Sequence, residues 1–200
     1  SLAPTDFGGA MDVGTSWSQG GDGPSGPGKN NLWLLIISKT GAVIRSKVFG
    51  GQGNDVGMNI SRTPSNEFFV TGYTTSADLD ASTARHNGDA WVMLLDFAGN
   101  QQWQKVLKAP YEDVLLDGCV NDYGLLAAVG STFRPGRSKD FWFVKMNNQG
   151  NVLHDLNYGE KDFDELTGIV PLSHGGYLAT GFFRRLPPSH PLFKGKEDFF

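Results

Sequence analysis

Residues 89–107 read DAWVMLLDFAGNQQWQKVL, and this stretch predicts the fold of the chain. Two strand-length runs, 89–96 and 100–107, flank the turn sequence DFAGN. Gly99 can adopt the positive φ that a tight hairpin needs, and Asp96 can accept hydrogen bonds from the backbone that follows it. The stretch is therefore expected to form an antiparallel β-hairpin.

The same hairpin pattern recurs on both sides of this stretch. The corresponding turns read SKTGA at 38–42 and NNQGN at 147–151. Three other positions also recur: an aromatic in the pattern Asp/Asn-x-aromatic, an Asp that opens an apolar run, and a Gly that ends one. They are Trp33, Trp91, Trp142 and Phe200; Asp55, Asp113 and Asp164; and Gly14, Gly72, Gly130 and Gly181.

The spacings of these positions indicate a repeated structural unit. Each tryptophan precedes the next repeated Asp by 22 residues, and each of these Asp residues precedes its Gly by 17. The Gly-to-aromatic interval is 19, 19, 12 and 19 residues, so all variation in length falls in one segment. A fixed scaffold with one tolerant surface loop produces such a pattern. The predicted units are 1–54, 55–112, 113–163 and 164–200.

Each unit contains four strand-like pieces, which we call strands a to d. In the second unit they are 56–62, 67–73, 89–96 and 100–107, and no helical period of ten residues is present. Four short antiparallel strands per repeat are typical of a β-propeller blade. We therefore predict an all-β, β-propeller-like fold of about three and a half repeats. We expect a fragment or partial ring, incomplete at both ends, with the repeated aromatic packed between blades.

Several segments resemble a repeat family of secreted and cell-surface proteins of Bacteroidetes-like bacteria. They are DAWVMLLDFAGNQQWQKVL, KVFGGQGNDVGMNISRTPS, HGGYLATGF and GYTTSADLDASTARHNGDAW. The resemblance covers nearly the whole chain, with Lys108 and Ala109 in place of the usual Gly-Gly pair and Phe200 in place of Trp. It implies propeller blades in type 9-secreted or surface-anchored proteins, an extracellular or outer-surface location, and an adhesive, scaffolding or complex-forming role without shared catalytic residues.

Composition excludes several classes of protein. The net charge of −4, from 17 basic and 21 acidic residues, comes with no basic stripe, so we expect no nucleic-acid partner. The longest apolar run, 32–37, is of strand length, so we expect no membrane span. Cys119 stands alone and excludes an internal disulfide. No secretory signal or catalytic motif is recognisable in the sequence.

The variable loops between strands b and c are the candidate binding surface, because loops on a rigid scaffold commonly carry recognition. They span 18–31, 76–88, 134–139 and 184–197 and should emerge on one side of the ring. At their starts stand Trp17, Thr75, Phe133 and Arg184, and Arg134 follows Phe133. We predict Trp17, Phe133, Arg134 and Arg184 as binding residues. The alternative is that the aromatic side chains fold under their own loops.

Other acidic residues admit two interpretations. Asp78 and Asp80 could offer oxygen ligands to Ca²⁺, but a solvated turn is the favoured interpretation, since no third acidic ligand and no later bidentate Glu follow as in an EF-hand. The repeated Asp residues that open strand a fit backbone capping better than catalysis.

These observations favour a non-catalytic binding or scaffold module of a bacterial cell-surface or secreted protein. Its expected partner is another envelope or outer-membrane protein, or a surface glycan. The alternatives are a propeller-based glycan-active enzyme and a Ca²⁺-dependent lectin, each with a site completed outside this chain. No cofactor is expected apart from the Ca²⁺ alternative.

Overall fold

The computed structural model describes residues 1–17, 24–79, 88–107, 111–134, 136, 138–159, 163–184 and 197–199. Their regular structure is almost entirely β-strand, with one 3₁₀ turn at Ala77–Leu79. Sheet 1 contains β1 (Leu2–Pro4), β2 (Ala10–Ser16), β3 (Asn31–Ile37) and β4 (Val43–Phe49). Sheet 2 contains β5 (Asp55–Arg62), β6 (Phe68–Thr74), β7 (Asp89–Leu95) and β8 (Gln101–Leu107).

Two further sheets follow in the chain. Sheet 3 contains β9 (Asp113–Val120), β10 (Leu126–Phe133), β11 (Lys139–Met146) and β12 (Val152–Tyr158). Sheet 4 contains β13 (Asp164–Pro171), β14 (Tyr177–Arg184) and β15 (Glu197–Phe199). The prediction of an all-β chain with four-stranded antiparallel sheets is confirmed, and the strands of sheet 2 lie within one residue of their predicted bounds.

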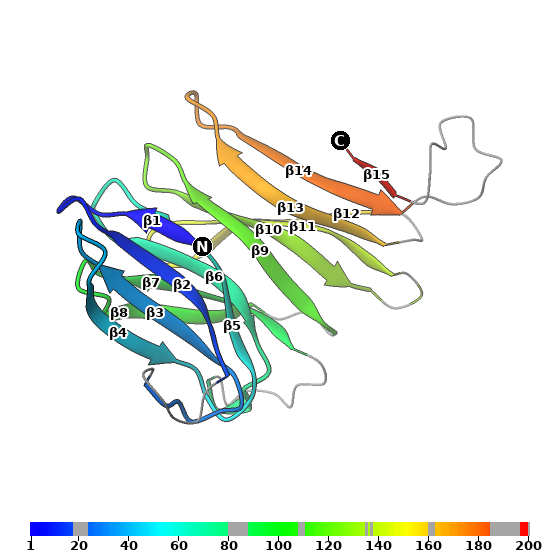
Figure 1. The fold of residues 1–200 in the computed structure, drawn as a ribbon. Helices are drawn as coiled ribbons and strands as arrows, with labels where there is room; N and C mark the ends of the chain where they lie inside the picture. The colour runs from blue at the N-terminus through cyan, green and yellow to red at the C-terminus, as the bar shows by residue number, and fades with distance from the viewer. Residues whose placement is uncertain are drawn as a thin grey trace.

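The sheets stack face to face, with sheet 1 and sheet 4 at opposite ends (Figure 1). Within each sheet, consecutive strands are hydrogen-bonded neighbours. The first strand of a sheet packs against the preceding sheet: β5 contacts β1, β2 and β3, β9 contacts β5, β6 and β7, and β13 contacts β9, β10 and β11. Each pair of neighbouring sheets is therefore joined by the same contacts, between strand a of one sheet and strands a, b and c of the preceding sheet.

Strand alternation gives each inner sheet two apolar faces. In β7, Trp91, Met93 and Leu95 pack against sheet 1, whereas Val92 and Leu94 pack against sheet 3. Successive side chains of a strand point to opposite faces, so a strand that is covered on both sides reads as a continuous apolar run. This packing explains why DAWVMLLD shows no apolar–polar alternation.

Turn glycines have the predicted backbone conformation. Gly41, Gly99 and Gly150 close the turns between strands c and d with φ of 82°, 70° and 70°. In the turn of sheet 2, the Asp96 carboxylate accepts hydrogen bonds from the backbone N–H groups of Ala98 (2.9 Å) and Asn100 (2.7 Å). The predicted hairpin chemistry is therefore present.

The repeated Gly of strand b allows a close approach of strand a. A Cβ atom on Gly72 would lie 1.9 Å from the carbonyl oxygen of Val56, and one on Gly130 would lie 2.0 Å from that of Val114. The ladders between strands a and b shift register beside both glycines. The repeated glycine thus belongs to a bulge that brings strand a against strand b.

The repeated tryptophans pack between sheets where a preceding sheet is present. Trp91 and Trp142 are buried, against sheets 1 and 2 respectively, as predicted. Trp33 belongs to sheet 1 and is only partly buried. Phe200, the fourth member of the series, lies outside the described residues.

A second contact between sheets links strand d to the following turn. The Arg45 guanidinium donates to the Ala98 carbonyl (2.9 Å), and the Trp103 indole N–H, 58 residues later, donates to the Asn148 carbonyl (2.8 Å). The Lys47 ammonium likewise donates to the Gly99 carbonyl (2.7 Å). Trp103 therefore has a structural role at the contact between sheets 2 and 3.

Among the described residues, no helix has the length and apolar character to cross a membrane.

Candidate functional site

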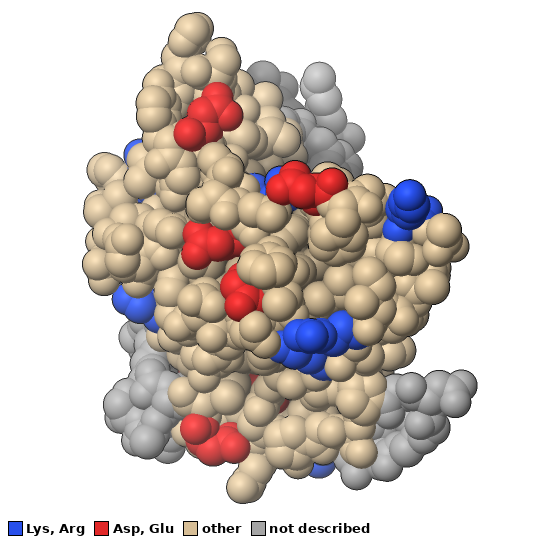
Figure 2. Space-filling model, turned by 90° about the vertical axis from the view of Figure 1, so that its left-hand side faces the viewer, with Lys and Arg blue, Asp and Glu red and all other residues tan. Residues whose placement is uncertain are grey.

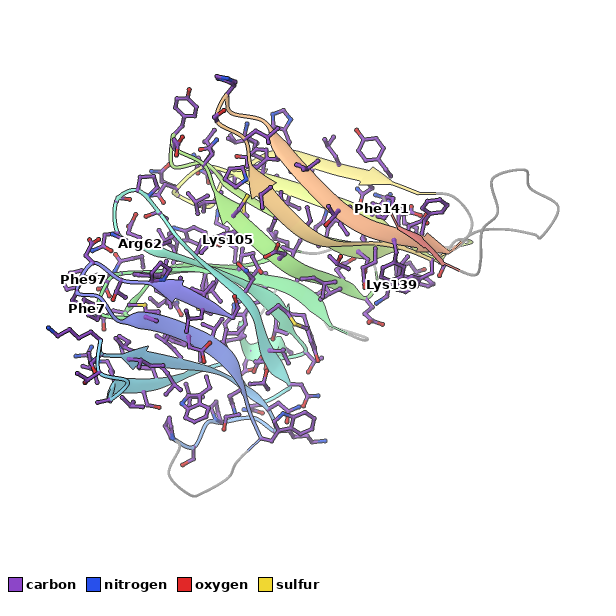
Figure 3. All side chains as sticks on the ribbon, turned by 45° about the horizontal axis from the view of Figure 1, so that its top comes forward. Phe7, Arg62, Phe97, Lys105, Lys139 and Phe141 are labelled. Carbon is purple, nitrogen blue, oxygen red and sulfur yellow. The ribbon has the colours of Figure 1, made fainter. Side chains whose placement is uncertain are left out.

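The loops between strands b and c begin at the same place in successive sheets. The backbone N–H of Thr75 donates to the Asn54 carbonyl (2.8 Å), and that of Phe133 donates to the Glu112 carbonyl (3.1 Å). These two contacts are 58 residues apart in both partners, so Thr75 and Phe133 occupy equivalent positions. Figure 3 places Lys139 and Phe141 at the strand ends that carry these loops, and Phe7 and Phe97 at the opposite strand ends. We call the first of these the loop end.

Two of the predicted binding residues belong to the outermost sheets. Trp17 follows β2 of sheet 1, and 75% of its surface is exposed. Arg184 is the last residue of β14 in sheet 4, and its backbone lies opposite that of Glu197 in the β14–β15 ladder. Sheets 2 and 3 lie between them, so Trp17 and Arg184 do not share a single site.

Phe133 takes part in a group of aromatic and charged side chains across sheets 3 and 4. Its ring lies 5.2 Å from the Tyr111 ring, at an interplanar angle of 59°. The Lys139 ammonium forms an ion pair with Glu112 (2.9 Å) and lies 5.9 Å from the centre of the Phe163 ring. We call Tyr111, Phe133, Lys139 and Phe163 the aromatic patch. The Phe163 ring also stacks on Phe182, at 5.7 Å and 17°.

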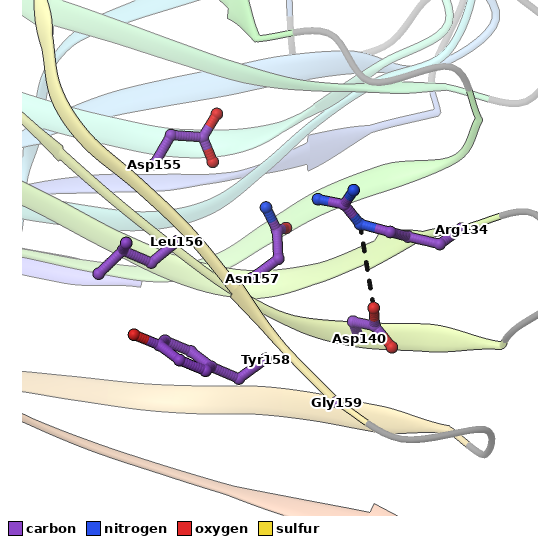
Figure 4. Close-up of a pocket in the computed structure, with 7 residues that line it drawn as sticks. All are labelled: Arg134, Asp140, Asp155, Leu156, Asn157, Tyr158 and Gly159. Atoms are coloured by element: carbon purple, nitrogen blue, oxygen red, sulfur yellow. Dashed lines mark ion pairs between the residues drawn. The ribbon is translucent and has the colours of Figure 1, made fainter.

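Arg134 lines a hollow of about 750 Å³ at the edge of sheet 3 (Figure 4). Its guanidinium, half exposed, lies 3.9 Å from the buried carboxylate of Asp140. Asp155 and Asn157 project from one side of β12 into the same region, whereas Leu156 and Tyr158 project from the other side (Figure 4). The hollow thus combines a cation, carboxylates and an amide, which can donate to and accept from hydroxyl groups.

Gly159 closes this hollow between two buried carboxylates. A Cβ atom at this position would lie 2.5 Å from Asp140 Oδ1 and 2.7 Å from Asp164 Oδ2. Any larger residue would therefore displace a carboxylate, and glycine keeps the two acidic side chains close together.

A second hollow, of about 450 Å³, lies between sheets 2 and 3 at the loop end. Its lining residues are Asn54, Tyr73, Thr75, Glu112, Asp113 and Val114. Glu112 belongs to this lining and also pairs with Lys139, so the second hollow adjoins the aromatic patch.

The repeated Asp at the start of strand a caps backbone and hydroxyl groups. The Asp55 carboxylate is fully buried and accepts hydrogen bonds from the Gly51 N–H (2.8 Å), the Ser76 hydroxyl (2.8 Å) and the Thr74 hydroxyl. Asp113 and Asp164 are buried at the equivalent positions of sheets 3 and 4. The capping role predicted for these residues is confirmed for Asp55.

The candidate Ca²⁺ ligand Asp78 has a structural contact of its own. Its two carboxylate oxygens accept from the Gln52 N–H at 3.1 and 3.2 Å. Asp80, the second candidate, lies outside the described residues. Within the described ranges, no group of three or more acidic, His or Cys side chains is arranged to hold a metal ion.

Sequence reasoning missed Tyr111 and Phe163 as parts of the site, and it included Lys139 only as the last residue of the loop 134–139. The residue directly before the repeated Asp differs from unit to unit: it is Asn54, Glu112 or Phe163. This variable position beside a constant Asp was the signal in the sequence that could have identified Phe163 as a site residue.

At the end of the strands opposite the loop end, Phe97 and Tyr123 are also exposed, and basic and acidic side chains are interspersed on the face shown in Figure 2.

Comparison with protein-family models and with curated proteins found no match to this chain.

Proposed function

We propose that the stacked sheets are blades of a β-propeller and that the chain is a non-catalytic binding module of a bacterial cell-surface or secreted protein. The resemblance stated above supports the location. The repeated inter-sheet contacts support the propeller, because identical contacts between successive units generate a regular curved stack.

The ligand that we propose for the loop end is a surface glycan. The single observation that supports it is the hollow beside Arg134, in which Asp140, Asp155 and Asn157 offer donors and acceptors in fixed positions. The aromatic patch, which spans sheets 3 and 4, offers ring faces on which a sugar can stack. Protein ligand sites commonly combine a few convergent polar groups with aromatic walls.

A protein partner is the second candidate, and one observation favours it. Trp17 and Tyr111 are exposed aromatic side chains on the loop side of their sheets. Large aromatic residues dominate binding energy at protein interfaces when a partner covers them. Under this alternative, the aromatic side chains would contribute more than the hollow beside Arg134.

Titration calorimetry with purified surface polysaccharide tests the glycan proposal. We expect Arg134→Ala to weaken binding by about tenfold, which corresponds to about 1.4 kcal/mol. Arg62→Ala is the matched control, because Arg62 pairs with Asp6, which lies in the turn that joins β1 to β2. An unchanged affinity in Arg134→Ala, or an equal loss in both variants, would contradict the proposed site.

Three additions to this experiment separate the remaining alternatives. A chelator should leave binding unchanged, whereas loss of binding with EDTA and recovery with Ca²⁺ would support the Ca²⁺-dependent lectin. Release of shorter saccharides during incubation would support the glycan-active enzyme. Co-purification of one defined protein without any glycan affinity would support the protein-partner alternative.

A further inference from the structure

The hollow between sheets 2 and 3 differs in chemistry from the hollow beside Arg134. It has a volume of about 450 Å³, and its lining offers the carboxylates of Glu112 and Asp113, the hydroxyl groups of Tyr73 and Thr75, and the amide of Asn54. None of the described residues that line it is basic. A lining rich in hydrogen-bond acceptors suits a ligand that donates hydrogen bonds and carries positive charge.

A small side chain stands at this junction where the neighbouring units have aromatic ones. Thr75 lines the hollow, and the equivalent residues are Trp17 in the first unit and Phe133 in the third. Glu112 lines it from sheet 3, and Phe163 holds the equivalent position before sheet 4. The side chains that differ between the repeats are therefore smaller or more polar here than at the next junction.

The junction between sheets 3 and 4 is also bridged at the equivalent place. There the Ser131 hydroxyl donates to the Glu165 carboxylate at 2.8 Å, across the two sheets. Tyr73 and Val114 hold these two positions between sheets 2 and 3, and both line the hollow. The open space is thus specific to one junction and does not follow from the repeated fold.

The groups at this hollow carry more negative than positive charge. The Asp113 carboxylate is 1% exposed, and the Glu112 carboxylate lies 2.9 Å from the Lys139 ammonium. With all three groups ionised, one positive charge stands against two negative charges. Charges that are partly withdrawn from water interact more strongly than exposed ones, so a single added cation would be attracted to this place.

We propose that this hollow binds an organic cation that consists of a guanidinium or primary ammonium group on a short apolar stem. The N–H groups of the cation would donate to the Glu112 and Asp113 carboxylates. The stem would lie against Val114 and the Tyr73 ring, and a cation near the face of an aromatic ring gains further stabilisation. Arginine and lysine side chains of a partner polypeptide share this chemistry with free amines.

Butylguanidinium is the probe for this site, and butylurea is its control, because the two molecules have the same shape and differ in charge. Titration into the ¹⁵N-labelled chain is followed through backbone amide signals. Butylguanidinium should shift the signals of Tyr73, Thr75 and Val114 saturably, with a dissociation constant of about 1 mM, as expected for a ligand of so few atoms. Butylurea should bind at least about tenfold more weakly.

Two substitutions in the hollow should weaken binding for different reasons. Thr75→Phe introduces the side chain that Phe133 provides in sheet 3, and it should abolish binding by filling the space without a change of charge. Glu112→Gln keeps the shape and removes one charge, and it should weaken binding about fivefold. Asp122→Asn removes the same charge from an exposed turn and should bind like the unsubstituted chain.

Lys139→Met should have the opposite effect. It removes the ammonium group that pairs with Glu112 and keeps an unbranched stem, so the net negative charge at the hollow increases. We expect butylguanidinium to bind about threefold more tightly. Damage to the local structure would instead weaken binding, so this variant separates an electrostatic effect from a structural one.

Three results would overturn the proposal. They are equal binding of butylguanidinium and butylurea, unchanged binding by Thr75→Phe and Glu112→Gln in folded chains, and weaker binding by Lys139→Met. If the cation site is confirmed, an acetylated and amidated Gly-Arg-Gly peptide identifies the source. Tighter binding of this peptide than of butylguanidinium assigns the site to a polypeptide side chain, and weaker binding assigns it to a free cation.

This proposal goes beyond the proposed glycan function and does not depend on it. Arg134 lines the other hollow, so Arg134→Ala should leave butylguanidinium binding unchanged. Absence of glycan affinity in a chain that binds butylguanidinium would contradict the proposed function alone. Absence of butylguanidinium binding in a chain that binds glycan would contradict the cation site alone.

Discussion

The indole N–H of Trp142 donates a hydrogen bond to Asp155 Oδ1 at 2.7 Å. The two residues are 13 positions apart, on strands c and d of sheet 3. Trp91 makes the equivalent bond to Gln104 Oε1 (3.2 Å) in sheet 2. Both rings are buried against the preceding sheet, so the polar atom of a large apolar side chain is satisfied within its own sheet while the ring joins two sheets.

Trp91→Ala should destabilise the chain severely. The substitution removes a fully buried ring between sheets 1 and 2 and leaves a cavity, which costs about 3–5 kcal/mol in the free energy of unfolding. Trp17→Ala removes an exposed ring and should change the same quantity by less than about 0.5 kcal/mol. Urea denaturation followed by circular dichroism measures both, and equal losses would show that Trp91 does not join the sheets.

Gly72→Ala should be poorly tolerated although alanine adds one methyl group. The new Cβ atom would lie 1.9 Å from the Val56 carbonyl oxygen, so β5 must move away from β6. We expect a loss of about 2 kcal/mol or more. Gly14→Ala is the matched control, because nothing lies within 4 Å of its Cβ position, and its stability should be unchanged or slightly raised. Thermal unfolding compares them, and a tolerated Gly72→Ala would contradict the bulge.

Asp55→Ala should destabilise the junction between sheets 1 and 2. It leaves the Gly51 N–H and the hydroxyl groups of Thr74 and Ser76 without their buried acceptor, at a cost of about 2–5 kcal/mol. Asp122→Ala, in an exposed turn, should have almost no effect. Chemical denaturation decides the comparison, and a stability loss below about 1 kcal/mol in Asp55→Ala would contradict the capping role.

Alkaline pH should lower the free energy of unfolding, because Cys119 of sheet 3 and Tyr177 of sheet 4 would lose their protons. Burial, followed by the nearby Asp117 charge, raises the pKa of the Cys119 thiol to about 12, and burial, followed by Cys119, raises the pKa of Tyr177 to about 12. The folded state holds these protons more tightly than the unfolded state. Stability from both groups is therefore complete below pH 9 and is lost as the pH rises from about 9 to 12.

Thiol reactivity provides a second measurement of the same effect. At pH 8, Cys119 should react with an aromatic disulfide reagent far more slowly in the folded chain than in guanidinium chloride, because it is buried and protonated. A constant free energy of unfolding between pH 9 and pH 11, or equal reaction rates in both states, would contradict this environment.

The sequence predicted the strands and turns well because their signals are local. Asp96 and Gly99 specify a hairpin within five residues, and the fixed spacing from Trp91 to Asp113 keeps each unit in the same register. The reason for the repeated Gly72 was not predictable, since the carbonyl that it faces belongs to another strand. The repeat pattern identified the position of Gly72, and the close packing of β5 against β6 explains why that position is a glycine.

The candidate site was predicted in part. Phe133 and Arg134 were identifiable because they begin a variable loop, and both contribute to the surface described for sheet 3. Phe163 was missed, and Lys139 was included only as the last residue of the loop 134–139, because their contact joins two sheets, which no local pattern encodes.

Hydrogen exchange of the indole N–H groups tests the central claim, that repeated tryptophans join copies of one four-stranded unit. In a spectrum of the ¹⁵N-tryptophan-labelled chain, the indole N–H groups of Trp91 and Trp142 should exchange slowly, since both rings are buried and both bond to strand d. The exposed Trp17 should exchange rapidly. Rapid exchange of both Trp91 and Trp142 in the folded chain would contradict the claim.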